Sequence, residues 1–380
     1  MAARVVIVGG GVVGSMHAFF ALSAGCEVVL IEREDAARGA SIRNFGLIWI
    51  SGRRGGEELE LALRARVLWE RVAAAVPDVG LRGNGSITVA QTDAELRVFE
   101  QVLARPDAEA RSLSLLDSVG VRALNPSLTG EILAGLHCGH DAAVEPRRVP
   151  NALLESMRGD PKFQSVSGRH VVEIGDGWAR DHYGEVHEGD VVLGCVGAAD
   201  RGIAGWAPDR NKLWRVRLQM LETEPADFRV TTSVADGDSL RYYPLFDVPA
   251  LADLPEPSEL VAEHKIQLLM QQRLDGSLTI GDTHLYDEPF DVSTVEAPYE
   301  HLRRRAESIL GRELPPTRRR WSGVYSQAPA DTLFHFEQLH ERAFVVTGAG
   351  GRGMTLSPAI AESVLARVGV AADATLVPSV

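Results

Sequence analysis

Residues 9–14 read GGGVVG and carry the glycine spacing G-x-G-x-x-G close to the start of the chain. In this pattern the first glycine permits a tight turn, the second lets backbone approach a pyrophosphate, and the third lets a helix pack closely on a strand. Glu32 stands near the spacing at which an acidic side chain accepts hydrogen bonds from ribose hydroxyls. The combination predicts a dinucleotide site. The alternative is a strand–helix unit that uses the glycines only in its turn.

A second glycine-rich segment lies near the other end of the chain, where residues 348–355 read GAGGRGMT. Glycines at this density let backbone approach a planar ring without a side-chain clash. A helix that follows such a segment points the positive end of its dipole toward the ring and stabilises negative charge there. The alternative for this segment is a flexible surface loop.

Both segments need strands and helices to place them. Around the first, we expect a strand over Arg4–Val8, a helix over Ser15–Ala24 and a parallel strand over Glu27–Ile31. Around the second, we expect a strand over Phe344–Thr347 and a closing helix over Ala359–Val368, with a proline just before its start. Two cofactor-type segments at opposite ends of the chain predict a discontinuous nucleotide-binding domain with a second domain inserted into it.

The middle of the chain mixes helical and strand patterns. Helices are predicted over residues 57–76, 94–104, 117–124, 151–157 and 296–310. Strands are predicted over residues 85–90, 215–222, 240–246, 265–271 and 277–281. The density of strand signals after residue 211 favours an antiparallel sheet with covering helices.

The composition restricts the class of function. The 39 basic and 52 acidic residues give a net charge of −13 at pH 7, which repels phosphate backbones and disfavours nucleic acid as a partner. Cys26, Cys138 and Cys195 show no paired spacing, so neither a disulfide framework nor a metal site is expected. Glycines interrupt the apolar N-terminal stretch, which argues against a signal peptide or a membrane span and favours the cytoplasm.

Five segments together resemble the D-amino-acid-oxidase-like superfamily of FAD-dependent oxidoreductases, which includes glycine and sarcosine oxidases. They are residues 9–14 with Glu32, residues 39–41, residues 167–174, residues 191–198 and residues 348–358. The resemblance implies an α/β fold with a Rossmann-like, discontinuous FAD-binding domain and an antiparallel-sheet (α+β) substrate domain. The FAD-binding domain is expected over 1–80, 145–212 and 326–380, and the substrate domain over 81–144 and 213–325.

The cofactor that the resemblance implies is FAD. Some relatives attach it through a cysteine in the strand ahead of the C-terminal glycines, but residues 321–326 (WSGVYS) contain none, so non-covalent FAD is expected. The residues expected to contact FAD are Gly9, Gly11, Val12, Val13, Gly14, Glu32, Arg33, Gly39, Ala40, Ser41, Asn44, Phe45, Gly46, Val171, Val196, Gly197, Gly350, Gly351, Arg352, Gly353, Met354 and Thr355. A nicotinamide-dependent dehydrogenase is the rival interpretation, and it would give residues 348–355 no role.

The resemblance also concerns the substrate. Related amino-acid oxidases hold the substrate carboxylate with an arginine in a Gly-x-Arg-Pro sequence, whereas residues 323–326 here read GVYS. Thr355 stands where sarcosine-type relatives carry a lysine. Arg43, Arg241 and Arg352 are therefore the candidate cations, because guanidinium groups suit carboxylate, phosphate and phosphonate alike. The sequences RNFG at 43–46 and GDTH at 281–284 resemble a less-characterised branch of the superfamily that is associated with aminophosphonate breakdown.

These features predict FAD-dependent oxidation of a C–N bond in a small primary or secondary amine bearing an anionic group, such as an aminophosphonate or an N-methyl amine. Hydride would pass to flavin N5, the imine would hydrolyse to an aldehyde or keto product, and O2 would be reduced to H2O2. The expected catalytic residues are Arg43, His284, Tyr325 and Arg352, and the expected substrate-binding residues are Trp49, Arg241 and Tyr243. A glycine- or sarcosine-like substrate, dehydrogenase in place of oxidase chemistry, and a non-catalytic FAD-binding module stay open, as does the oligomeric state.

Overall fold

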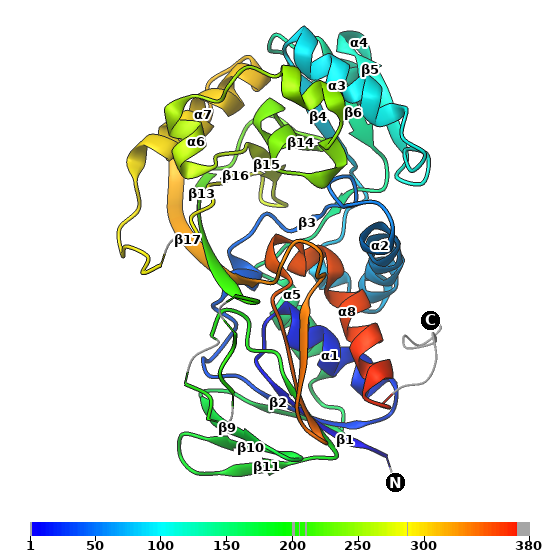
Figure 1. The fold of residues 1–380 in the computed structure, drawn as a ribbon, viewed down its shortest axis with the longest axis vertical. Coiled ribbons are helices and arrows are strands. Elements are labelled where there is room, and N and C mark those ends of the chain that lie inside the picture. Colours follow the sequence, from blue (N-terminus) through cyan, green and yellow to red (C-terminus); the bar gives the residue numbers. More distant parts are fainter. Residues whose placement is uncertain (1, 200–201, 205, 210, 287, 371–380) are drawn as a thin grey trace.

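The computed structural model describes residues 2–199, 202–204, 206–209, 211–286 and 288–370, and two large β-sheets organise them (Figure 1). One sheet lies at the end of the molecule that carries the N-terminus, and the other lies at the opposite end. The long axis of the molecule therefore runs from one sheet to the other.

The first sheet has six strands in the order β18-β19-β12-β1-β2-β8. Neighbouring strands run parallel except for β18, which pairs antiparallel with β19 at the edge. The strands are β1 Arg4–Val8, β2 Glu27–Ile31, β8 Phe163–Val166, β12 Val191–Gly194, β18 His335–His340 and β19 Ala343–Thr347. Strands from both ends of the chain thus share one parallel sheet, which confirms the Rossmann-like and discontinuous arrangement.

Helices cover one face of this sheet and a small sheet covers the other. The helices are α1 Val12–Ser23, α2 Glu57–Ala75, α5 Val149–Met157 and α8 Gly353–Arg367, and the small sheet comprises β9 Val171–Gly175, β10 Trp178–Asp181 and β11 Val186–Glu188. Val5 and Ile7 pack in the cluster on the helical side, whereas Val6 and Val8 pack with Val171 on the other side. This alternation follows from the two-residue period of a strand that is buried on both faces.

The second sheet has eight strands in the order β17-β13-β16-β15-β14-β4-β6-β5. Neighbours pair antiparallel except for β14 and β4, which run parallel. The strands are β4 Ser86–Ala90, β5 Leu113–Asp117, β6 Ala134–Cys138, β13 Trp214–Thr223, β14 Ser233–Ala235, β15 Leu269–Gln272, β16 Leu278–Gly281 and β17 Thr317–Gln327. The antiparallel sheet predicted from the sequence is confirmed.

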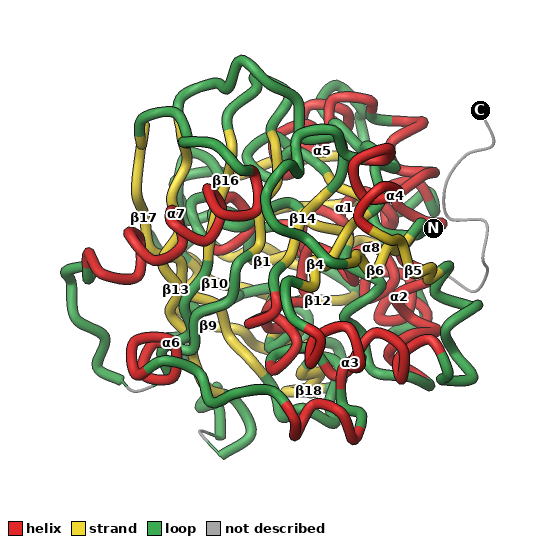
Figure 2. Tube along the Cα trace, turned by 90° about the horizontal axis from the view of Figure 1, so that it is seen from above, coloured by secondary structure: helices red, strands yellow, loops and turns green. Residues whose placement is uncertain are grey.

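Helices pack on both faces of this second sheet. The outer face carries α4 Ser118–Leu124, α6 Glu259–His264 and α7 Glu296–Leu310, whereas α3 Asp93–Leu103 packs on the opposite face, in the same cluster as Trp49 and Tyr243. Seen from above, α7 crosses β13 and β16, against which it packs (Figure 2). The two-residue strands β3 (Leu47–Ile48) and β7 (Ala142–Ala143) pair between the large sheets. Within the described ranges, the structure has no helix of the length and hydropathy that a membrane crossing requires.

The strand predicted over residues 240–246 is wrong. The chain there forms two 3-10 turns, η3 Gly237–Arg241 and η4 Pro244–Phe246. The Asp236 carboxylate accepts hydrogen bonds from the backbone N–H of Asp238 (3.1 Å) and of Ser239 (3.4 Å), which starts the first turn. Pro244 opens the second turn and cannot donate to a strand ladder. Arg241 therefore ends the first turn, and Tyr242 and Tyr243 lie between the two turns rather than on a strand.

The closing helix α8 begins at Gly353, well before the predicted start, so Pro358 lies inside it. A proline inside a helix leaves one carbonyl without its usual N–H donor, and here that carbonyl belongs to Met354. The indole Nε1 of Trp69 in α2 donates to the Met354 oxygen at 3.1 Å, and Ser357 Oγ donates to it at 3.3 Å. These two bonds replace the missing one and let the helix continue up to the glycine segment.

Candidate active site

The N-terminal glycine turn has the geometry that its spacing predicts. Gly9 adopts a positive φ of 105°, and a Cβ atom there would lie 2.3 Å from the Cys195 carbonyl oxygen. A Cβ atom on Gly14 would lie 1.9 Å from the Gly9 oxygen, so only glycine lets α1 approach β1 this closely. The Glu32 carboxylate at the end of β2 accepts a hydrogen bond from the Gly10 N–H at 2.6 Å and is held beside the turn.

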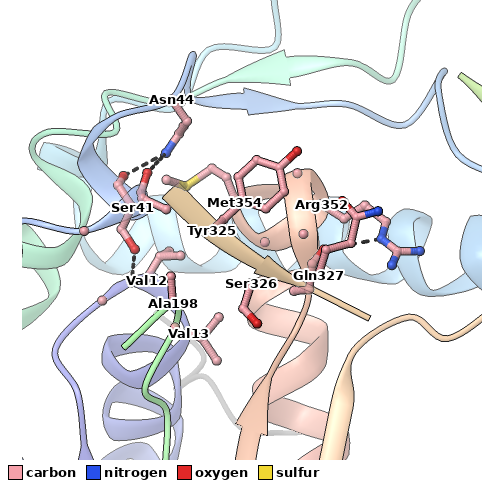
Figure 3. A pocket seen from close by; sticks show the side chains of 18 of the residues that line it. Val12, Val13, Ser41, Asn44, Ala198, Tyr325, Ser326, Gln327, Arg352 and Met354 are labelled. Carbon is pink, nitrogen blue, oxygen red and sulfur yellow. Dashed lines mark hydrogen bonds between the residues drawn. The ribbon is translucent and has the colours of Figure 1, made fainter. Parts of the chain in front are cut away.

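The loop after β2 folds back over the start of α1. Ser41, in the 3-10 turn η1 (Ala40–Ile42), accepts a hydrogen bond at Oγ from the Val12 N–H at 2.9 Å. The Asn44 side chain donates to the Ala40 and Ser41 carbonyls at 2.8 and 2.9 Å and fixes the loop (Figure 3). The small and amide side chains of residues 39–46 therefore brace one wall of a cavity.

This cavity has a volume of about 910 Å³ and is lined by both glycine segments. Figure 3 shows the side chains on the cavity wall. One side carries Val12, Val13 and Ala198, and the other carries Tyr325 and Gln327 of β17 together with Arg352 and Met354 at the start of α8. Of the residues predicted to contact FAD, all line the cavity except two, which are Gly14 and Gly46. Gly14 serves the packing of α1, and Gly46, with a φ of 74°, serves a turn against the Val144 carbonyl.

The residues present fit FAD. The volume lies at the upper end of the range of roughly 300–1,000 Å³ that small-molecule and cofactor sites enclose. A Cβ atom on Gly11 would lie 3.0 Å from Ser41 Oγ, inside the space that the turn and the loop leave between them. At the other end of the cavity the first turn of α8 contributes Gly353, Met354 and Thr355 to the wall. The cavity thus joins a nucleotide turn to a helix N-terminus that favours negative charge.

A family model described as FAD dependent oxidoreductase matches residues 4–367. The chain belongs to this family of FAD-dependent oxidoreductases. The match overturns the nicotinamide-dependent alternative, because the family uses FAD. The match includes the glycine-rich segment 348–355, which lines the cavity in the structure.

Comparison with individual proteins supports the fold of this oxidoreductase. The chain is 26% identical to a subunit of the opine oxidase of Rhizobium meliloti over 164 residues, which are 40% of this chain and only 44% of that relative. Glycine oxidase from Geobacillus kaustophilus superposes with a TM-score of 0.79 at 19% identity, covering 98% of this chain and 96% of that one. Iminodiacetate oxidase from Chelativorans sp. superposes with a TM-score of 0.74 at 16% identity, covering 97% and 95%.

All seven residues predicted to act on the substrate line the cavity of the oxidoreductase, namely Arg43, Trp49, Arg241, Tyr243, His284, Tyr325 and Arg352. All three of these arginines already have polar partners, and Arg352 Nη2 donates to the Thr332 carbonyl at 2.9 Å. Arg43 Nη1 donates to the Ser322 carbonyl at 3.1 Å. Arg241 donates to the Pro255 carbonyl and lies 3.6 Å from the Asp238 carboxylate. Each of these guanidinium groups would have to share or change its contacts in order to bind a ligand.

The third predicted arginine belongs to a buried cluster that the sequence did not reveal. Arg352 Nη1 lies 3.7 Å from one oxygen of Glu58, and Arg53 Nη1 lies 3.5 Å from the other. The side chains of Arg53, Glu58 and Arg352 are 7%, 6% and 12% exposed. Two cations therefore face one anion on the cavity wall. Burial lowers the pKa of Arg352, and the Glu58 charge opposes that shift.

Aromatic side chains line the cavity next to this cluster. Tyr242 stacks on His284 with ring centroids 4.3 Å apart and meets Tyr243 edge-on at 5.1 Å. Trp49 lies 5.9 Å from Tyr243, and the Arg53 guanidinium lies over the Tyr243 ring at 5.8 Å. Burial raises the pKa of Tyr243 and Tyr325 well above the ordinary value, so both hydroxyls are neutral. Sequence reasoning named Tyr243 and Tyr325 but passed over Tyr242.

Further cavity residues were missed by sequence reasoning, namely Arg53, Arg54, Glu58, Tyr242, Gln267, Asp282 and Tyr286. The pair Arg53-Arg54 follows the predicted site residue Trp49 closely, and Asp282 stands within the GDTH sequence. Their closeness in sequence to predicted site residues was the signal that could have identified Arg53, Arg54 and Asp282. Most of these residues lie on loops, where no periodicity marks them, and Glu58 lies in the first turn of α2.

A group of potential metal ligands lies away from the cavity. Asp181, Glu185 and His187 place ligand atoms within 4.8 Å of one another. The Arg169 guanidinium already lies 2.8 Å from the Asp181 carboxylate and 3.2 Å from that of Glu185. The positive charge of Arg169 therefore already faces both carboxylates. Cys26, Cys138 and Cys195 are all buried and free.

Proposed function

We propose that this oxidoreductase oxidises the C–N bond of a small primary or secondary amine that bears an anionic group, using non-covalently bound FAD. The observation that supports it most is the excess of positive charge on the cavity wall, where Arg53 and Arg352 share the single carboxylate of Glu58. A buried guanidinium without its own counter-ion is stabilised by an anionic ligand, because burial makes an unpaired charge costly. Glycine and iminodiacetate, after which two structural neighbours are named, are amines that carry carboxylates.

When bound, FAD supplies the two-electron chemistry by accepting hydride at N5 from the carbon next to nitrogen. The chain's own residues hold and orient the amine. Arg352 and Arg53 bind the anionic group, and the rings of Trp49 and Tyr243 exclude water from the reacting carbon. The N-terminal turn of α8 borders the same space and favours negative charge there. The imine then hydrolyses to an aldehyde or keto product, and O2 takes up the electrons as H2O2.

The charge of the cluster favours a phosphonate among the possible anions. Arg53 Nε already donates to the Trp49 carbonyl, and Arg352 donates to the Ala349 and Thr332 carbonyls. The remaining N–H groups of the two planar forks suit the several oxygens of a phosphonate as well as a carboxylate. We therefore place aminophosphonates and their N-methyl derivatives first. Glycine- or sarcosine-like amino acids are the second candidate class, since the superposed glycine and iminodiacetate oxidases are named for such substrates.

The experiment is an anaerobic titration of the purified yellow protein, followed by its visible absorption band. The panel comprises 2-aminoethylphosphonate, its N-methyl derivative, glycine, sarcosine and propylamine. We expect the anionic amines to bleach the band and propylamine to leave it unchanged at equal concentration. Bleaching by propylamine as readily as by the anionic amines would contradict the proposal. A yellow protein that no amine bleaches would favour the non-catalytic FAD-binding module.

The same panel tests the anion-binding residues and the electron acceptor. Arg352→Gln is expected to raise the concentration of anionic amine needed for bleaching by tenfold or more, because a charge-assisted hydrogen bond contributes about 1.5–3 kcal/mol. Arg304→Gln, on the exposed face of α7, is the matched control and should change nothing. Peroxide release in air, measured with a coupled peroxidase, distinguishes an oxidase from a dehydrogenase.

A further inference from the structure

A buried carboxylate on the cavity wall has no arginine or lysine partner among the described residues. Asp282 follows β16 directly, is 4% exposed, and lines the same cavity as the arginine cluster. In the described ranges, the ionisable side chain that lies within ion-pair distance of the Asp282 carboxylate is His284, whose Nε2 lies 3.8 Å from Asp282 Oδ2. Charged carboxylates are rarely buried without a cation, so the site is built for a positive group that the chain itself does not supply.

The Asp282 side chain is held in a fixed position. Gln267 Nε2 donates to Asp282 Oδ1 at 3.2 Å. The backbones of the same two residues exchange hydrogen bonds, with Asp282 N–H donating to Gln267 O at 2.8 Å and Gln267 N–H to Asp282 O at 3.1 Å. His284 is oriented in turn by a 3.2 Å contact between its Nδ1 and the Lys265 carbonyl. A carboxylate constrained at both backbone and side chain is pre-organised for a ligand.

Four tyrosines line the same cavity as this carboxylate, and each comes from a loop or strand that borders the cavity. They are Tyr242, Tyr243, Tyr286 and Tyr325. Burial raises the pKa of each hydroxyl, and the negative charge of Asp282 raises it further. Aromatic faces around a carboxylate are the environment that binds ammonium groups, through cation–π attraction and charge-assisted hydrogen bonds.

The acidic and the basic groups occupy different parts of one cavity. The Tyr242 and Tyr325 hydroxyls both come within 3.8 Å of the Cβ position of Gly351, the residue next to Arg352. The Tyr243 ring lies under the Arg53 guanidinium at 5.8 Å. Tyr243 thus contacts the arginine cluster, and its neighbour Tyr242 stacks on His284, the ion-pair partner of Asp282. A short molecule with an ammonium group at one end and an anion at the other matches this order of charges.

We propose that Asp282 is a catalytic residue that binds the substrate's ammonium group and accepts its proton. The inference rests on the proposed function, because it names the group that recognises the amine end of the same substrate. In this step an N–H bond of the ammonium group breaks, and an O–H bond forms on the carboxylate, with no change in oxidation state. The products are a carboxylic acid and a neutral amine whose lone pair is free. That lone pair can then assist the departure of hydride from the neighbouring carbon.

The pKa of Asp282 agrees with this role. Burial raises the pKa of the carboxyl group, while the His284 charge and the Gln267 hydrogen bond lower it. The groups that face it from other elements are Tyr242 and Tyr243 after η3, Tyr325 in β17 and Tyr286, all neutral phenols. A carboxylate with a raised pKa is a better proton acceptor than an ordinary one, because its affinity for the proton lies closer to that of the amine.

The test uses matched probe pairs that differ only in the amino group, with binding read from the perturbation of the flavin spectrum in the holoenzyme. The pairs are 2-aminoethylphosphonate with ethylphosphonate, and β-alanine with propionate. Where a probe is oxidised, its Kd is taken from the rapid anaerobic phase before bleaching. In the unaltered enzyme the amino member of at least one pair should bind tenfold or more tightly than its partner. In Asp282→Asn this advantage should vanish, while ethylphosphonate and propionate bind as before.

The control is Glu263→Gln, which removes one exposed negative charge outside the cavity and should keep the advantage. An equal advantage in Asp282→Asn and the unaltered enzyme would overturn the inference and leave the proposed function intact. Amino and non-amino probes that bind equally in the unaltered enzyme would overturn it as well. Bleaching by propylamine in the earlier titration, with the advantage still lost in Asp282→Asn, would instead overturn only the requirement for an anionic group in the proposed function.

A second readout separates proton acceptance from binding. Without a proton acceptor, Asp282→Asn can use only the neutral amine, whose fraction in solution rises tenfold with each pH unit below the amine pKa. The rate of bleaching at low probe concentration should therefore rise tenfold per pH unit in the variant and much less steeply in the unaltered enzyme. Parallel profiles would show that Asp282 does not accept the proton.

Discussion

The Arg352 guanidinium lies 3.7 Å from Glu58, and the opposite oxygen of that carboxylate lies 3.5 Å from Arg53. One buried anion thus holds two cations that come from the loop after β3 and from the start of α8. Glu58 itself belongs to the first turn of α2. Three elements that are remote in the sequence therefore set the charge of the cavity.

Replacement of Glu58 by glutamine tests that charge. The variant leaves two guanidinium groups without a carboxylate, so ethylphosphonate should bind several-fold more tightly as an added counter-ion. The free energy of unfolding without ligand should fall by about 1–3 kcal/mol, because the two buried cations then repel each other. Urea unfolding and a spectral titration measure the two quantities. Weaker ethylphosphonate binding would show that Glu58 positions the arginines and does not merely neutralise them.

Gly14→Ala should abolish FAD binding and destabilise the fold. The new Cβ atom would lie 1.9 Å from the Gly9 oxygen, a backbone atom that cannot move without opening the turn. We expect a loss of about 2–4 kcal/mol in stability, in the range of overpacking and strain combined. The flavin content of the purified protein and its thermal unfolding are the measurements. Gly83→Ala is the control, since its Cβ would meet only the end of the Arg66 side chain. Full flavin content in Gly14→Ala would contradict the packing role assigned to Gly14.

Trp69 and Pro358 should be energetically coupled through the Met354 carbonyl. Trp69→Phe removes the indole donor at 3.1 Å and should cost about 1–3 kcal/mol, the cost of a buried carbonyl that loses a partner, together with lost packing. In a Pro358→Ala background the alanine N–H can bond the same carbonyl, so the same change should cost less. Urea unfolding of both single variants and the double variant measures the coupling. Equal costs in the two backgrounds would refute it.

Stability should fall in mild acid through His17. Burial lowers the pKa of this histidine to about 4, and the Val13 carbonyl that contacts its Nδ1 at 2.7 Å opposes the shift. The unfolded chain then binds a proton below about pH 6.5 while the folded chain does not, so stability is lost as pH falls from there toward 4. The full contribution is about 3 kcal/mol.

The check is urea unfolding from pH 4 to pH 8 with His17→Gln as the reference. The difference between the two proteins should be flat above pH 7 and should shrink or reverse below it. A difference that stays constant over the whole range would mean that His17 is not held neutral by the fold.

The cofactor half of the site followed from the sequence because its requirements are local. A turn against Cys195 and a helix packed on Gly9 need glycine at fixed spacing, and the spacing is visible without any tertiary information. The strand runs on either side of the turn also read correctly, since strands buried on both faces are continuously apolar. Errors arose where local patterns mislead, as at residues 240–246, where an aspartate cap and a proline override strand-forming residues.

The substrate half was decided by the tertiary structure. Arg53, Glu58 and Asp282 lie at element ends and in loops, where the sequence has no period to reveal which side chains meet. Their significance comes from burial and from the count of charges in one enclosed space, and both quantities exist only after the two sheets close around the cavity. The sequence determined that a dinucleotide could bind, because that needs only backbone and small side chains. Packing alone determined which charges line the cavity beside it, because an ion's partner is set by distance in space.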